Sequence, residues 1–461
     1  PWSIHENIFK LPPAGMLELP LDGSPPLDAL PEPRIWWRHP LLVPPGERSL
    51  LPAEEEEKSV LDRLEDLLRK AVAERMIADV PLGAFLSGGI DSSLVVALMR
   101  EHARAPVKTF SIGFREADHD EAPFARRVAR HLGTDHRELY VTPDEARSVI
   151  PELARIHDEP FADSSQIPTT LVARLARTEV TVALSGDGGD EAFCGYHRYL
   201  WGEEVAQRTG RVPLALRRLA AGTIRCLPRA SAALLRLIAG LSITPLGRTR
   251  SPHRLLVTAE LLAAETPGEW YDALTLYWPR HSTTLAGEMP LPPHWRAIRG
   301  GRRRPLAEFL MAADSIGYLP NDILTKVDRA AMSCSLETRI PFLDPAVQDF
   351  AARIPHRMRV RDGRGKWPLR ALLARHLPRT LFDRPKQGFA VPIAAWLRGP
   401  LREWAGDLIS PDRLHREGLI EAKTIAALWD EHQRGEEDWS PILWAAAMFE
   451  AWREESANDP L

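Results

Sequence analysis

The sequence predicts an α/β fold: a parallel sheet flanked by helices and extended toward the C-terminus by further helices. Three observations indicate this class. Between residues 54 and 200, short apolar segments alternate with helical segments of about 10–15 residues, a pattern typical of βαβ units with parallel strands. Two of the apolar segments end in loops rich in glycine and carboxylates, and parallel sheets bind ligands at the carboxyl ends of their strands. After residue 200, helical patterns predominate.

The individual elements follow from apolar periodicity. A first helix is expected over 54–78, because apolar residues recur at helical spacing from Val60 to Val72 and the acidic run 54–57 suits a solvated helix start. Strands are expected over 80–86, 107–114, 136–141 and 180–184. Further helices are expected over 121–132, 143–157 and 166–178, and a final helix is expected to bury Trp439, Trp444, Phe449 and Trp452.

Length and composition describe an ordinary globular chain. Its 461 residues leave room for two or three domains, and a formal net charge of −4 gives no support for a nucleic-acid or membrane partner. The three widely spaced cysteines predict a reducing, cytoplasmic compartment. No stretch approaches the roughly 20 apolar residues of a membrane helix, and the N-terminus does not look like a signal peptide. The basic patch at 299–304 is expected to be a solvated loop.

The first glycine-rich loop is the centre of the functional prediction. The apolar segment ending at Leu86 runs into Ser87, Gly88 and Gly89, and then into Asp91, Ser92 and Ser93 at the start of a helix. The glycines let backbone N–H groups turn inward, and a helix N-terminus attracts an anion such as phosphate. Because Asp91 would repel a phosphate, the loop also implies a bridging Mg²⁺. The alternative is a capped turn that binds nothing.

The second loop, 185–191, supports the first. It places three glycines and the carboxylates of Asp187, Asp190 and Glu191 directly after an apolar strand. Clustered carboxylates repel one another, so the arrangement predicts a divalent metal or a cationic substrate group. We expect the loops after Leu86, Ile112 and Leu184 to converge on one site. Here too, a capped turn without a ligand is the alternative.

Ser87-Gly88-Gly89-Ile90-Asp91-Ser92-Ser93 resembles the pyrophosphate loop of ATP pyrophosphatases that form acyl-adenylates. With the 185–191 loop and the segment 318–344, the chain resembles the synthetase domain of the glutamine-hydrolysing asparagine synthetase family over about residues 55–455. The resemblance implies an adenine nucleotide alpha hydrolase-like domain that uses ATP and Mg²⁺. It implies that the β-carboxylate of aspartate attacks the α-phosphorus of ATP, and that ammonia captures the β-aspartyl-AMP, giving asparagine, AMP and pyrophosphate.

Carried over by motif, the resemblance implies roles for single residues. Asp91 and Asp190 would hold the metal, and Lys386, supported by Lys366, would stabilise the leaving pyrophosphate. Asp187 stands where the best-known asparagine synthetases have glutamate, proposed to assist ammonia attack, so its shorter side chain is a departure. The residues expected to contact ATP are Leu86, Ser87, Gly88, Gly89, Asp91, Ser92, Ser93, Ile112, Ser185, Gly186 and Lys366.

A further segment, 158–168, looks like the part of the family that faces the acceptor amino acid. Asp163, Ser164 and Glu191 are the candidate substrate contacts. An equally weighted alternative is that Asp163 or Ser164 caps the helix that starts at Gln166. His157 is expected to be structural. The charged residues Asp322, Lys326, Asp328 and Arg329 are expected to form ion pairs that brace two lobes, in preference to a role in catalysis.

The predicted organisation has three parts. Residues 1–53 resemble a remnant of the family's glutaminase domain and a proline-rich linker, 54–200 form the ATP-pyrophosphatase core, and 201–461 form its mostly helical remainder. The glutaminase nucleophile is an N-terminal cysteine, which this chain lacks, so glutamine hydrolysis is not assigned. A glutaminase domain is expected as a partner but absent here, and a homodimer is considered.

Substrate choice is the least constrained inference, because fold and adenylation chemistry do not fix the acceptor. One alternative is an amidotransferase or cyclase that acts on another carboxylate, like the β-lactam-forming or cell-surface-modifying relatives. A second is a non-catalytic protein that binds a nucleotide.

Overall fold

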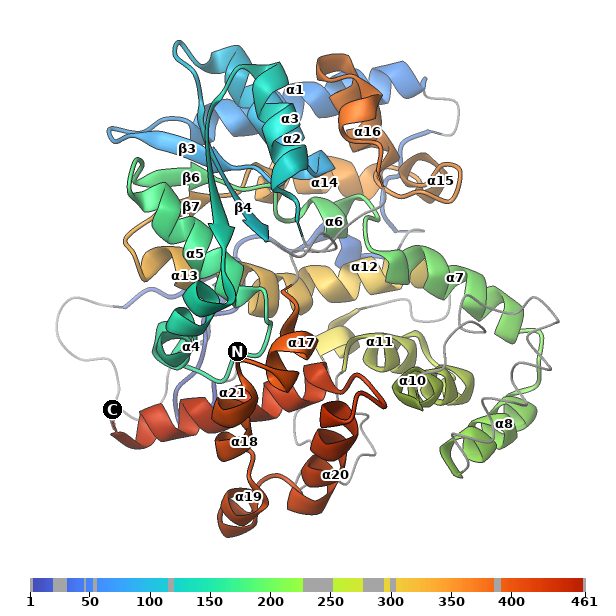
Figure 1. The fold of residues 1–461 in the computed structure, drawn as a ribbon. Helices are drawn as coiled ribbons and strands as arrows, with labels where there is room; N and C mark the ends of the chain where they lie inside the picture. Colours follow the sequence, from blue (N-terminus) through green and yellow to red (C-terminus); the bar gives the residue numbers. More distant parts are fainter. Residues whose placement is uncertain are drawn as a thin grey trace.

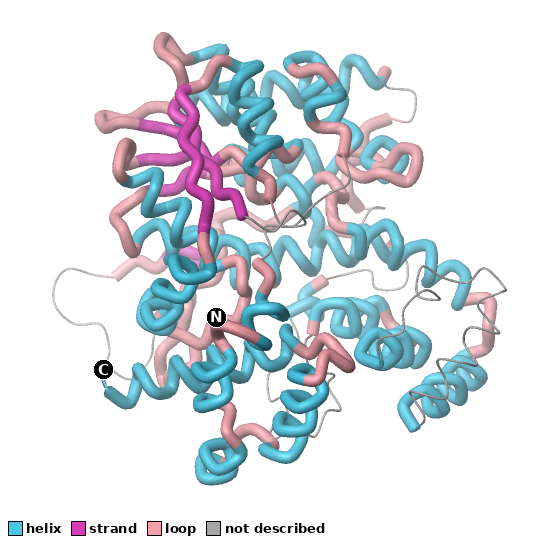
Figure 2. The backbone as a smooth tube through the Cα atoms, in the orientation of Figure 1, coloured by secondary structure: helices cyan, strands magenta, loops and turns pink. Residues whose placement is uncertain are grey.

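The computed structural model describes residues 3–19, 31–44, 47–52, 56–114, 120–226, 252–276, 294–298, 304–384 and 391–458. A five-stranded sheet lies in the upper left of Figures 1 and 2, with helices on both faces, and a large helical region lies below and to the right of it. This arrangement confirms the predicted α/β class with a helical extension.

The sheet is parallel throughout and has the order β5-β4-β3-β6-β7. Its strands are β3 (Leu82–Phe85), β4 (Lys108–Phe114), β5 (Asp135–Val141), β6 (Val182–Leu184) and β7 (Glu337–Arg339). The four predicted strands are confirmed, although the first and last are shorter than expected. Strand β7 lies more than 150 residues after β6 and was not predicted from the sequence.

Successive residues of a strand point to opposite faces of the sheet. Both faces carry apolar side chains, and a layer of helices covers each face. Val107 and Ala84 pack with one layer, and Phe110, Ile112 and Phe114 pack with the other. The first layer contains α1 (Glu57–Arg75), α2 (Ile90–His102), α3 (Ala122–Leu132), α14 (Pro345–Arg353) and α16 (Trp367–His376). The second contains α4 (Pro143–His157), α5 (Gln166–Arg177) and α13 (Thr325–Met332).

The C-terminal helices extend the second layer (Figure 1). They are α17 (Ile393–Arg398), α18 (Arg402–Leu408), α19 (Pro411–Glu417), α20 (Ala422–Gln433) and α21 (Ser440–Asn458). Trp439 and Trp444 are buried as expected, whereas Trp452 is half-buried and its indole N–H donates to the Asp158 carbonyl at 2.9 Å.

A separate helical region contains α6 (Gly189–Ala192), α7 (His197–Thr209), α8 (Leu214–Cys226), α10 (Pro252–Ala263), α11 (Pro267–Thr275) and α12 (Leu306–Ile316). Helix α12 packs against α7 and α11 in a third apolar cluster. None of the helices in the described part of the chain is both long enough and apolar enough to cross a membrane.

The described parts of the N-terminal segment contain regular secondary structure, which an extended linker would not have. Strand β1 (Gly15–Met16) pairs antiparallel with β2 (Arg34–Ile35), and a 3₁₀ turn at Pro40–Leu42 buries Leu41 in the third cluster. Arg304, predicted to lie in a solvated patch, is instead buried and donates to the carbonyls of Leu41 and Leu42. A buried guanidinium needs such acceptors, and here the backbone supplies them. The rest of the patch, 299–303, lies outside the described residues.

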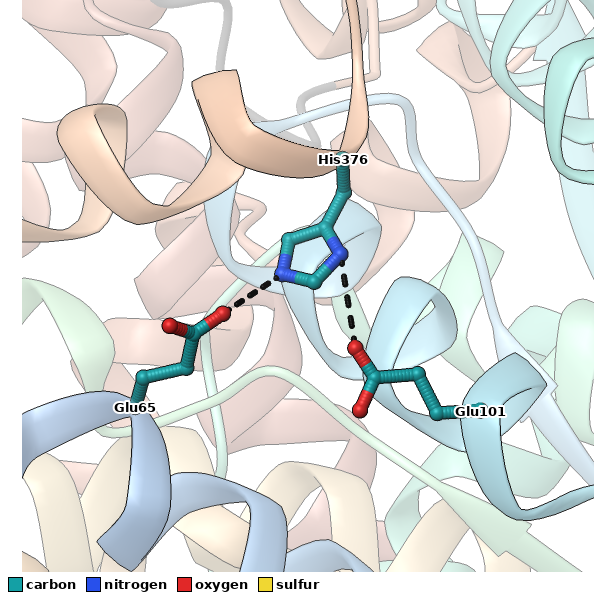
Figure 3. Close-up of side chains that lie close together, drawn as sticks. All are labelled: Glu65, Glu101 and His376. Carbon is teal, nitrogen blue, oxygen red and sulfur yellow. Dashed lines mark hydrogen bonds and ion pairs between the residues drawn. The ribbon is translucent and has the colours of Figure 1, made fainter. Parts of the chain in front are cut away.

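A cluster of charged groups joins three helices of the first layer (Figure 3). His376, the last residue of α16, lies between Glu65 of α1 (3.0 Å) and Glu101 in the last turn of α2 (3.6 Å). The ligand atoms of these three residues lie close enough together to bind a metal ion. Arg69 and Arg375 already pair with the carboxylates, so ion pairing accounts for the cluster.

We expect Glu65→Ala to lower the free energy of unfolding by about 2–3 kcal/mol, because it leaves Arg375 and His376 without this nearly buried partner. Chemical denaturation measures the change. The matched control is Asp66→Ala in the same helix, where the exposed ion pair with Arg69 should contribute less than about 0.5 kcal/mol. Equal losses in the two variants would contradict the structural role of the cluster.

Candidate functional site

The strand order reverses between β3 and β6, and the candidate site lies at this reversal. In the chain β3 is followed by β4 on one side, whereas β6 and β7 are added on the other side of β3. Loops that leave such neighbouring strands diverge and open a crevice at their carboxyl ends. A cavity of about 710 Å³ lies there, a size typical of nucleotide and small-molecule sites.

The first loop is held in shape by its own serines. Ser87 Oγ accepts the Gly89 N–H at 3.2 Å and lies 3.0 Å from Ser92 Oγ. Leu86, Ser87, Gly89, Asp91 and Ser92 line the cavity. Gly88 and Ser93 lie behind that lining: Gly88, at φ +72°, touches α3, and Ser93 is buried within α2. The geometry therefore gives no support to direct ATP contacts from these two residues.

The second loop continues β6 and packs on the first loop. The Ser185 N–H donates to the Arg339 carbonyl at 2.9 Å, and Ser185 Oγ donates to Asp187 Oδ2 at 2.5 Å. A Cβ at Gly186 would lie 2.7 Å from the Ser92 backbone nitrogen, and one at Gly189 would lie 2.5 Å from Asp91 Oδ1. Glycine at these two positions is therefore what allows the loops to touch.

The contact brings two predicted metal ligands together around a lysine. Lys366 Nζ contacts Asp91 Oδ2 and lies 2.8 Å from Asp190 Oδ1. Burial alone would lower the pKa of Lys366, but the two carboxylates outweigh it and hold the pKa above its usual range. The structure places the Lys366 ammonium between the two carboxylates, and its expected role at the phosphates stays a prediction.

Two further acids line the same wall of the cavity. Burial raises the pKa of Asp187. Burial, and then the charge of Asp190, raises the pKa of Glu191 to about 8, while the Tyr196 hydroxyl donates to Glu191 at 2.8 Å. With a pKa of about 8, the Glu191 carboxyl can exchange a proton near neutral pH, as a group that manages an amine must.

The predicted acceptor segment also lines the cavity. Asp163 Oδ2 lies 2.6 Å from Lys326 Nζ and accepts from Ser165 Oγ at 2.8 Å, and Ser164 also lines the cavity. Asp163 accepts the Ser165 N–H at 2.9 Å and so closes the turn just before α5. The N-cap residue of α5 is Ser165, which makes no side-chain capping bond, so the predicted capping by Asp163 or Ser164 is wrong. Burial, then Asp163, raises the pKa of Asp322 to about 7.

The charged residues of α13 form ion pairs with this segment. Lys326 pairs with Asp163, and Arg329 pairs with Asp158 at 2.8 Å. Both pairs join α13 to the segment between α4 and α5 in the same helical layer, with partners about 165 residues earlier in the chain. The predicted ion pairing is therefore observed for these two residues, but it does not bridge two lobes. Lys326 also lies in the cavity beside the candidate substrate contacts, a position that was not predicted. Its helical spacing with other charged residues indicated ion pairing but carried no sign of a cavity.

Several lining residues were not recognised from the sequence. The cavity is also lined by Tyr196, Tyr318, Arg370 and Arg384. Arg384 forms an ion pair with Glu121, with 3.1 Å between Nη2 and Oε1. Tyr196 follows the second loop closely and could have been included on that ground. Lys386, the predicted catalytic lysine, lies outside the described residues, so its role stays a prediction.

The donor set fits a divalent cation. Mg²⁺ is bound through one or two carboxylates together with substrate phosphates, and Asp91 and Asp190 already face one point occupied by a cation. The residues that could hold the metal are therefore the two that the sequence predicted.

Comparison with known proteins identifies the family. The asparagine synthase family model matches residues 63–454. The chain belongs to the asparagine synthase family. It is 30% identical over 413 residues to asparagine synthetase [glutamine-hydrolyzing] 1 of Bacillus subtilis, which covers 87% of this chain and 60% of that protein. It is 33% identical over 393 residues to a putative asparagine synthetase [glutamine-hydrolyzing] of Mycobacterium tuberculosis, covering 85% of this chain and 57% of that protein.

A third relative, a putative asparagine synthetase [glutamine-hydrolyzing] 2 of Methanocaldococcus jannaschii, is 40% identical over 205 residues, which are 44% of this chain and 36% of that protein. The chain spans about 60% of the length of the first two relatives. These matches confirm the resemblance stated from the motifs.

We expect Gly186→Ala to lower the unfolding temperature and to weaken Mg-ATP binding at least about tenfold, because the new Cβ would push apart the two loops of this asparagine synthase domain. Thermal unfolding and calorimetry measure the two effects. Gly222→Ala on α8 is the control: no neighbouring heavy atom lies within 4 Å of its Cβ, so alanine should stabilise the helix by up to about 1 kcal/mol. Unchanged nucleotide affinity in Gly186→Ala would refute the close-contact argument.

A second prediction concerns acid stability. Burial, then Arg329, lowers the pKa of His157 to about 4, and its ring stacks on Phe161 at 4.3 Å. The unfolded chain therefore binds the extra proton between about pH 6.5 and 4, so stability falls as pH falls through this window. His157→Phe should reduce that loss by about 3 kcal/mol, measured by denaturation at pH 6.5 and pH 4. Burial also lowers the pKa of His39 to about 4, and His39 therefore adds the same acid-dependent loss of stability to the wild type and to His157→Phe. His131→Ala, at an exposed position of α3, is the control. If His157→Phe lost as much stability at low pH as the wild type, the prediction would be contradicted.

Proposed function

We propose that this chain catalyses ATP-dependent amide formation, and that its substrates are aspartate and ammonia. The observation that carries the proposal is the meeting of two glycine-rich loops, whose carboxylates Asp91 and Asp190 face one cationic point at the strand reversal. Family membership supports the same class of reaction. The β-carboxylate of aspartate attacks the α-phosphorus of ATP, pyrophosphate leaves, and ammonia converts β-aspartyl-AMP to asparagine and AMP.

The chain's own residues have distinct tasks in this proposal. Asp91 and Asp190 hold Mg²⁺, which supplies positive charge to the phosphates. The nucleotide is oriented by Ser87, Ser92 and Ser185 and by the backbone of Gly89 and Gly186. Its adenosine is bordered by Leu86 and Ile112. Lys366, together with Lys386, stabilises charge on the leaving pyrophosphate. Lys326 and Ser164 contact the acceptor side, where Asp163 fixes the Lys326 ammonium.

Proton management falls to the acids with raised pKa values. Ammonia reaches the site largely as ammonium, which has to lose a proton before its nitrogen can attack a carbonyl. Asp187 is the proposed acceptor of that proton, and Glu191 borders the same space. The reaction takes place in the cytoplasm, where ATP is available. The core that carries it spans 54–200 and is completed by 201–461.

One observation favours a second candidate, amide formation on a different carboxylate. Asp187 is one methylene shorter than the glutamate expected at this position, which leaves more room beside the acceptor for a bulkier acid or amine.

Pyrophosphate release tests these proposals. With Mg-ATP and ammonium, we expect release that depends on aspartate within a panel of carboxylic acids. Dependence on another acid would support the second candidate, and no release with any acid would refute both and leave a nucleotide-binding role.

We expect Asp91→Asn to reduce pyrophosphate release at least about 100-fold without loss of fold, because it removes a charge that holds the metal. Circular dichroism checks the fold. Asp144→Asn, on the exposed start of α4, is the matched control and should keep full activity. Full turnover in Asp91→Asn would remove the metal assignment.

A further inference from the structure

The path of the Lys366 side chain is built by two neighbouring glycines. A Cβ at Gly195 would overlap both Lys366 Cε and Asp190 Oδ1, and a Cβ at Gly365 would overlap the Cys194 carbonyl. Lys366 itself has the left-handed conformation, φ +58°, at the start of α16, and its N–H donates to the Phe193 carbonyl at 3.0 Å. This backbone conformation is strained for a lysine, so the surrounding structure must hold it. It directs the Lys366 ammonium to one point.

That point is the space shared by the two carboxylates. The side chain of Lys366 is 6% exposed, and those of Asp91 and Asp190 are 18% and 19% exposed. Two carboxylates this close repel strongly at low dielectric unless a cation lies between them. One ammonium compensates one of the two charges, so the trio retains a net charge of −1.

A divalent ion shared by Asp91 and Asp190 would need the same space. Metal–oxygen distances are about 2.1 Å for Mg²⁺, so an ion between these oxygens excludes an ammonium that contacts both of them. The ammonium and the metal are therefore competitors for one position.

We propose that Lys366 is a built-in counter-ion that holds Asp91 and Asp190 together in the metal-free protein and is displaced when a divalent metal enters with the nucleotide. This inference rests on the proposed function in taking Asp91 and Asp190 as the metal ligands. It adds an order of events: a free metal ion must compete with the ammonium, whereas a metal that arrives with a triphosphate brings a new anionic partner for the lysine.

The test measures binding of Mn²⁺, a spectroscopic substitute for Mg²⁺, without nucleotide, by electron paramagnetic resonance of the free ion. We expect Lys366→Met to bind Mn²⁺ at least about tenfold more tightly than the wild type, because the competing charge is gone. Adding Asp91→Asn to Lys366→Met should abolish the gain. Lys108→Met is the control, since Lys108 pairs with Glu179 at the other end of the sheet and its removal should leave Mn²⁺ binding unchanged.

Equal Mn²⁺ affinity in wild type and Lys366→Met would overturn the proposal, as would a gain that persists in the double variant. If Lys366→Met is too unstable without metal, its thermal unfolding gives the answer: Mn²⁺ should raise its unfolding temperature more than that of the wild type, and equal shifts would overturn the proposal.

These outcomes are separable from the proposed reaction. The Mn²⁺ assay contains no aspartate and no ammonium, so it reports on the carboxylates and the lysine alone. A tighter Mn²⁺ site in Lys366→Met together with no pyrophosphate release by the wild type would uphold the counter-ion and refute the reaction. Pyrophosphate release with unchanged Mn²⁺ affinity would do the reverse.

Discussion

The site depends on one constraint: two acidic loops must touch, and their like charges must be compensated. Gly186 and Gly189 allow the 185–191 loop to rest on the first turn of α2, which brings Asp190 toward Asp91. Without a cation the two carboxylates would drive the loops apart. Lys366 supplies that cation from a segment about 275 residues later than Asp91, so the cavity is completed only when the C-terminal half of the chain has packed.

Helices α2 and α16, which carry Asp91 and follow Lys366, are held together by ion pairs at both of their ends. Helix α2 starts at the site with Asp91 in its first turn, and α16 starts directly after Lys366. The helices pack against each other, and at their far ends Glu101 and His376 meet with Glu65 of α1 (Figure 3). Ion pairs at both ends fix the position of each helix start, and precise placement of charged groups is what electrostatic catalysis requires.

The segment predicted to face the acceptor is also held by ion pairs between distant residues. Here the lysine lies on a helix and the aspartate on a turn, whereas Lys366 precedes a helix and Asp91 lies within one. The lysine on α13 meets an aspartate on the turn before α5, and a second pair joins Arg329 to Asp158. The cavity is thus lined by two lysine–aspartate groups, one held by the first helical layer and one by the second. In the proposed reaction the first group serves the nucleotide and the second serves the acceptor.

Local patterns in the sequence determined four of the strands, the helices between them and the two loops that line the cavity, because strand and helix periodicity and glycine-rich turns are set by neighbouring residues. They also determined the family, through motifs that are contiguous in the chain. They did not determine β7, the buried position of Arg304, or the partners of Lys326 and Lys366. Each of these depends on which distant segment lies opposite, and a charge with a hundred or more residues between it and its partner carries no local signal of that partner. Only the packed tertiary structure decided that one lysine would stand between the two acids.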